Sequence, residues 1–180
     1  MSTNDIALAM GRIERVLRRR PETGLGDDTA ATARWLGGTR VVASHASGAN
    51  IATDMAVELG GTGDQVSPGW LFRAGLASCL ATCVAMNAAA RGIHLTQLEV
   101  RTSSRSDTRG FLGMCDANQR AVDAGSRDIQ LQVRLGAEGV SADKLRELVI
   151  DSQRCAPVSS TLSQARFLAL QIEIVGSEAL

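Results

Sequence analysis

The sequence predicts a single α+β domain of 180 residues. Candidate strands occur in blocks around three candidate helices, a pattern that disfavours a wound parallel sheet. The longest candidate helix, at 67–91, is apolar almost all round, so we expect it to be buried on most sides. A later segment, 129–135, alternates between apolar and polar residues, which is typical of a half-buried strand.

The composition excludes several classes of protein. Hydrophobic residues make up 44% and charged residues 21%, so the chain is not mostly disordered. Nineteen basic residues balance nineteen acidic ones, aromatic residues are 3% and Tyr is absent, so we expect no nucleic-acid partner. Arg73 and Asn87 interrupt the most apolar stretch, 71–90, and we expect no membrane span.

Residues 1–28 are predicted to form an N-terminal helix and linker, and residues 29–180 the main domain. The helix is expected from Asp5 to Arg19, where apolar residues recur at helical spacing and Pro21 follows. We expect this helix to pack across a dimer. The N-terminus lacks the charged and apolar regions of a secretory signal. We therefore expect a cytoplasmic protein whose four cysteines are free thiols.

The first half of the main domain is predicted to be β. Short strands are expected at 32–36, 40–45 and 51–59, with turns at 47–50 and 60–63. Ser67 followed by Pro68 is a favoured helix start, because serine caps the first turn and proline suits its first position. The long helix should then end near Arg91, with Gly92 as its C-cap.

The second half is predicted to mix strands with one more helix. Strands are expected at 94–101, 111–114 and 129–135, with a polar turn at 103–110 and a loop at 115–127. Ser141 should cap a helix that runs into residues 154–157, and a closing strand is expected at 166–175.

The cysteines are the candidate reactive groups. Cys79 lies in the middle of the apolar helix, where a cysteine is either a small core residue or a nucleophile that needs a nearby cation. Cys83 shares its face, but i and i+4 cysteines on a helix rarely form a disulfide. No further Cys or His follows at zinc-ligand spacing, so no metal or other cofactor is expected. Only the fold could bring Cys155 to Cys79, and Cys115 lies in a polar loop.

Two segments carry a family resemblance. The stretch SPGWLFRAGLASCLATC at 67–83, followed by ARGI at 90–93 and the strand LEV at 98–100, resembles the OsmC/Ohr family of osmotically inducible and organic hydroperoxide resistance proteins. The stretch CAPVSSTL at 155–162 resembles the second cysteine motif of that family. The resemblance covers roughly residues 30–175. The helix opening and the segment 106–114 are similar to a less characterised branch.

The resemblance implies an OsmC-like fold, an intertwined homodimer in which antiparallel-rich sheets wrap long central helices and each active site lies at the subunit interface. It also implies a thiol peroxidase that reduces organic hydroperoxides and is itself reduced by an external dithiol. Cys79 would be the peroxidatic residue and Cys155 the resolving one. Arg40 would stabilise the thiolate, with Arg34 as a second candidate.

Two positions depart from the family pattern. Gly69 occupies the place of the glutamate that positions the arginine, and Cys155 lies one residue earlier than usual, with Ala156 before Pro157. A catalytically inactive protein that binds a small molecule or lipid is therefore the alternative. A third interpretation is a one-cysteine peroxidase resolved by an external thiol. Resolution by Cys83 is disfavoured by the helical geometry.

Overall fold

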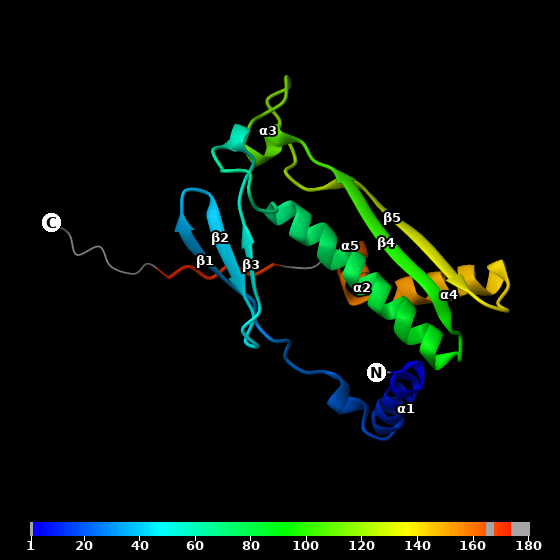
Figure 1. Cartoon of the computed structure of the whole chain (residues 1–180). Helices are drawn as coiled ribbons and strands as arrows, with labels where there is room; N and C mark the ends of the chain where they lie inside the picture. Colours follow the sequence, from blue (N-terminus) through cyan, green and yellow to red (C-terminus); the bar gives the residue numbers. More distant parts are fainter. Residues whose placement is uncertain (1, 165–167, 174–180) are drawn as a thin grey trace.

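The computed structural model describes residues 2–164 and 168–173 and is a mixed α+β domain (Figure 1). Its elements in chain order are α1 (Thr3–Arg19), η1 (Pro21–Gly24), β1 (Thr32–Gly37), β2 (Arg40–Ser44), β3 (Asn50–Thr53), η2 (Val57–Leu59), α2 (Pro68–Ala90), β4 (Leu95–Arg105), α3 (Thr108–Phe111), β5 (Arg127–Ala137), α4 (Ala142–Cys155) and α5 (Pro157–Ser163).

The central helix α2 forms where the capping pattern predicted it. The Ser67 hydroxyl accepts a hydrogen bond from the Trp70 N–H at 3.2 Å, and Pro68 takes the first helical position. At the other end Gly92 has φ of 65°, the left-handed conformation that stops a helix. Both predicted ends are confirmed.

One face of α2 packs against a long antiparallel ribbon made by β4 and β5. The register pairs Leu98 with Leu135 and Val100 with Val133, so apolar side chains from both strands point to the same face. These side chains pack on a buried cluster formed by α2, α4 and the start of α5. Its members are Leu80, Val84, Ala88, Leu148 and Ala156. Figure 1 shows the ribbon running alongside α2.

The other sheet is three-stranded and antiparallel, in the order β1-β2-β3. Figure 1 shows it on the opposite side of α2 from the ribbon. Its connection to the rest of the chain includes a bridge between Thr53 and Val66, just before α2. Among the described residues this sheet makes few contacts with the helices, and Trp35, Leu36 and Ile51 are exposed on it.

Four sequence expectations need correction. The strand expected at 51–59 ends at Thr53, because the chain turns there into the short helix η2. The polar turn at 103–110 is instead the end of β4 followed by α3, which Asp107 caps by accepting from the Arg109 N–H. Residues 111–114 are not a strand. The second cysteine motif is divided between two helices, since Cys155 ends α4 and Pro157 begins a separate helix, α5, at the position that suits proline.

The closing strand expected at 166–175 lies partly outside the described residues. Of that segment the structure describes 168–173, which form no strand there.

The expectation that α2 is buried on most sides holds for one side only. Leu76, Leu80 and Val84 are buried, whereas Ser78 and Thr82 on the opposite side are exposed. By length and composition alone, α2 is long and apolar enough to cross a membrane. The interruption by Arg73 and Asn87 that was expected to exclude a membrane span is therefore too weak to do so by these criteria. The core helix of a globular domain passes the same test, and α2 packs against α1, β4, α4 and α5.

Candidate functional site

Two of the candidate thiols lie one turn apart on α2. Cys79 and Cys83 are both half-buried and pack against the central cluster. Burial of the Cys83 side chain raises the pKa of its thiol, and a hydrogen bond and the charge of the Cys79 sulfur act in the same direction. The raised pKa favours the protonated form of the Cys83 thiol, which can donate its S–H to the Cys79 sulfur.

The third thiol comes from the far end of the sequence. Cys155 is the last residue of α4 and is exposed, while the next residue, Ala156, is fully buried in the cluster on which Cys79 and Cys83 pack. The charge of Cys155 contributes to the raised pKa of Cys83. The fold thus places Cys155 near Cys83, which lies one turn from Cys79 on α2.

The displacement of Cys155 by one residue coincides with a break in the helix. Ala156 has an extended backbone, with φ of −75° and ψ of 114°, and separates α4 from α5. In a continuous helix, the side chains of two neighbouring residues would point in directions about 100° apart. Cys115 lies elsewhere, exposed beside a bridge to Ala121.

Arg40 stands at the start of β2 and is held by two carboxylates. Its guanidinium donates to Asp54 at 3.0 Å, to the Thr62 hydroxyl at 2.6 Å, and to Asp64. The hydrogen bonds to Asp54 and then Asp64 raise the pKa of Arg40. Within one chain, no described cysteine is among the polar contacts of Arg40. Arg34, the second candidate, is exposed on β1 opposite Val42.

Asp54 is a buried carboxylate that the sequence analysis missed. It accepts hydrogen bonds from the hydroxyls of Thr39 and Thr62 and from the N–H groups of Met55 and Thr62. These bonds, that of Thr39 first, lower the pKa of Asp54 well below its ordinary range. The sequence signal was weak, because Asp54 meets its partners only after the chain has folded back on itself.

Gly61 allows the chain to turn back on itself after Asp54. A Cβ atom at this position would collide with the backbone carbonyl of Met55. The close approach brings Thr62 and Asp64 to Arg40. Gly69 was expected to leave the arginine without its family carboxylate partner, and Arg40 instead pairs with Asp54 and Asp64.

A cavity of about 410 Å³ lies at the N-terminal end of α2. Met55, Leu59 and Phe111 contribute apolar walls, and Gly69 and Arg73 line it from the first two turns of the helix. Arg73 is half-buried, and its one polar contact within the described part of the chain is with the Ser104 hydroxyl at 3.5 Å.

Asp107 also lines this cavity, but its carboxylate is already occupied. Both its oxygens accept from Arg109, at 3.0 and 2.7 Å, and this pairing lowers the pKa of Asp107 to about 2. Arg73 therefore has no carboxylate partner among the described residues.

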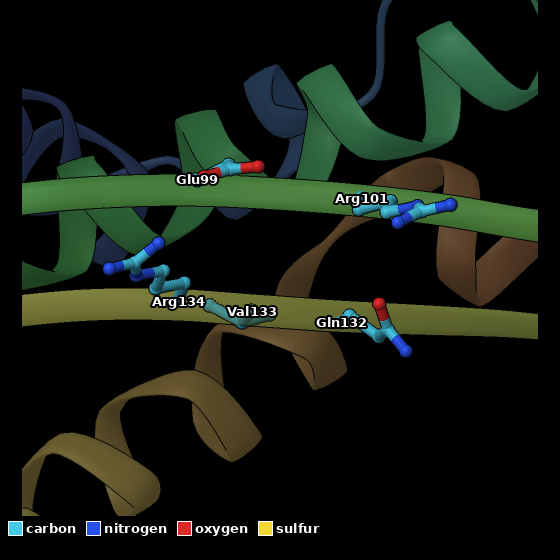
Figure 2. A pocket seen from close by; sticks show the side chains of 5 residues that line it. All are labelled: Glu99, Arg101, Gln132, Val133 and Arg134. Atoms are coloured by element: carbon cyan, nitrogen blue, oxygen red, sulfur yellow. The ribbon is translucent and has the colours of Figure 1, made fainter.

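A smaller hollow of about 200 Å³ lies on the ribbon. Figure 2 shows its side chains rising from the two adjacent strands β4 and β5, including Glu99, Arg101 and Arg134. No cysteine lines it. Among residues 2–164 and 168–173, no group of three or more His, Cys, Asp or Glu side chains could hold a metal ion.

The fold is shared with solved structures from bacteria. An OsmC-like protein from Mycoplasma pneumoniae matches with a TM-score of 0.63 and 18% identity over 77% of this chain and 89% of that one. An OsmC-like protein of unknown function from Vibrio cholerae matches with a TM-score of 0.61 and 11% identity over 76% and 94%. An organic hydroperoxide resistance protein OsmC from Legionella pneumophila gives 0.53 and 22% over 77% and 90%.

These likenesses define an OsmC-like fold. The family model for OsmC-like proteins matches residues 61–170, which span α2, the ribbon, α4 and α5. The chain therefore belongs to the OsmC-like protein family, and the resemblance seen in the sequence is confirmed. No curated protein sequence matches the chain.

Proposed function

We propose that this protein is a cytoplasmic, homodimeric thiol peroxidase that reduces organic hydroperoxides in defence against oxidative stress. The observation that carries the proposal is that Cys79 packs on the cluster that contains Ala156, the residue after Cys155, and that Cys155 lies near Cys83, one turn from Cys79. Relatives of the same fold include organic hydroperoxide resistance proteins from Legionella pneumophila and Vibrio cholerae. An arginine held by the buried carboxylate of Asp54 supports the proposal further.

The chemistry assigns one step to each thiol. The Cys79 thiolate attacks the distal oxygen of the hydroperoxide, the O–O bond breaks, and the alkoxide leaves as an alcohol after taking a proton. The resulting sulfenic acid condenses with the Cys155 thiol, which forms a disulfide and releases water. An external dithiol then reduces this disulfide by exchange and becomes a disulfide itself.

A second copy of the chain would complete the site. Arg40 has no cysteine contact within its own chain, and the sheet that bears it makes few contacts with the helices of the same chain. The exposed side of α2, with Ser78 and Thr82, is left uncovered. We infer that α2 pairs with its copy, and that Arg40 of one chain serves Cys79 of the other.

The test is peroxide consumption by the purified protein with cumene hydroperoxide and dihydrolipoamide. We expect turnover by the unchanged protein, none by Cys79→Ser, and unchanged turnover by Cys115→Ser, in which an exposed loop thiol is removed. Absence of turnover, with all thiols still reduced after peroxide is added, would overturn the proposal.

A binding protein without catalysis is the second candidate. It is favoured by the cavity at the start of α2, where Gly69 stands in place of the family glutamate. Loss of turnover together with ligand binding in that cavity would select it.

A further inference from the structure

The cavity at the start of α2 presents an unpaired cation beside apolar walls. The pairing of Arg109 with Asp107 neutralises the one carboxylate that lines the cavity among the residues described. Among the polar groups of residues 2–164 and 168–173, Arg73 contacts only the Ser104 hydroxyl, at 3.5 Å, so most of its five N–H donors are free for a ligand. A half-buried guanidinium with free donors recognises a planar carboxylate well, since it can bind both oxygens at once.

A second donor lies next to this cation. The N–H of Gly69 belongs to the first turn of α2, which has no partners within the helix. No other described residue accepts from it. A Cβ atom at Gly69 would lie 3.7 Å from Nη1 of Arg73, so the absent side chain leaves space beside the guanidinium. The helix N-terminus adds partial positive charge there.

The rest of the cavity suits an apolar body. Met55, Leu59, Pro68 and Phe111 line it, and its volume of about 410 Å³ is within the range of small-molecule sites. The charge and the walls together select a molecule with one anionic end and one apolar end.

We propose that this cavity binds a small amphipathic carboxylate, with the carboxylate on Arg73 and the Gly69 N–H and the aliphatic or aromatic body against Met55, Leu59 and Phe111. This binding site is separate from the three thiols and does not depend on peroxidase activity. It assigns Gly69 a role, because a glutamate there would fill the space and pair with Arg73 one turn later.

The experiment is calorimetric titration of the full-length protein with octanoate and, separately, with octanol. We expect saturable binding of one octanoate per chain and binding of octanol that is at least about tenfold weaker, since only octanoate engages the cation. Arg73→Gln should remove the preference for octanoate, while Arg73→Lys should keep part of it. Gly69→Glu should block binding.

Arg101→Gln is the matched control, because Arg101 is exposed on β4, outside the cavity (Figure 2). This variant should bind as the unchanged protein does. Equal binding of octanoate and octanol, no binding of either, or an unchanged preference in folded Arg73→Gln and Gly69→Glu would each overturn the proposal. Peroxide turnover is measured on the same samples, so failure of one proposal is distinguished from failure of the other.

Discussion

Arg40 and Asp54 form an ion pair of 3.0 Å in which the carboxylate side chain is only 2% exposed. The pair joins the start of β2 to the loop after β3, across 14 residues of sequence. Because Asp54 also accepts four hydrogen bonds from Thr39, Met55 and Thr62, its position is held by groups other than Arg40. Arg40 is thereby oriented without the glutamate of the family motif.

Replacement of Asp54 by Asn should make stability less sensitive to acid. The pKa of Asp54 is lowered on folding from its ordinary value of 3.8, so the carboxylate stabilises the fold above about pH 4. That contribution is lost as the pH falls toward the lowered pKa. We expect Asp54→Asn to melt earlier at pH 7 and to lose less on acidification.

Thermal melting of both proteins between pH 7 and pH 3 measures this. Asp64→Asn is the control, since that carboxylate is 54% exposed and its ion pair should contribute less. If the melting temperatures of Asp54→Asn and of the unchanged protein fall equally as the pH is lowered, the buried carboxylate makes no pH-dependent contribution to stability.

Arg40→Gln should slow peroxide consumption strongly, because the proposed reaction needs a cation at the Cys79 sulfur. Arg34→Gln should leave the rate unchanged, since Arg34 is exposed on β1. Arg40→Lys keeps the charge and should keep part of the rate. Initial rates with cumene hydroperoxide compare the three variants. A slow Arg34→Gln beside an active Arg40→Gln would transfer the role to Arg34.

Cys155→Ser should abolish the disulfide formed after peroxide treatment and reduce turnover with a dithiol. Cys83→Ala should retain both, because burial and neighbouring sulfurs keep the Cys83 thiol protonated. Peptide mapping without reduction identifies the bridge. Full turnover by Cys155→Ser would favour the one-cysteine interpretation, and a bridge from Cys79 to Cys83 would contradict this assignment.

Leu148→Ala should destabilise the protein by about 2–5 kcal/mol, since Leu148 is fully buried between α4 and α2 and its truncation leaves a cavity. Ile150, two residues on, is 51% exposed, and Ile150→Ala should cost no more than about 0.5 kcal/mol. Urea unfolding measures both. A similar loss of unfolding free energy in the two variants would mean that Ile150 is buried against a second copy of the chain in the dimer.

Thr82→Arg should convert the proposed dimer to a monomer. Thr82 lies on the exposed side of α2, where a pairing of two copies would bury an added charge at high cost. Gln130→Arg, on β5, adds the same charge at another exposed site and should leave the dimer intact. Light scattering after size exclusion gives the mass. A dimer that persists in Thr82→Arg would place the interface elsewhere.

The helices were predictable because their signals are local. Ser67 with Pro68, and Ser141 with the apolar spacing that follows it, specify helix starts within a few residues of sequence, and both starts are observed. The alternation at 129–135 likewise predicted β5. The segment 103–114 was predicted wrongly, because no clear apolar pattern in the sequence marks the helix α3 that Asp107 caps.

The sequence by itself determined the fold class, the central helix and the family, because caps, periodicity and a cysteine motif can be recognised in short segments. Only the tertiary structure decided which groups meet. The approach of Cys155 to Cys83 and the ion pairs of Arg40 with Asp54 and Asp64 join segments 14 or more residues apart. The charge of Arg73 has no carboxylate partner among the described residues, which also depends on how the chain folds. Such relations follow from how the sheets and helices pack, and packing depends on the whole chain at once.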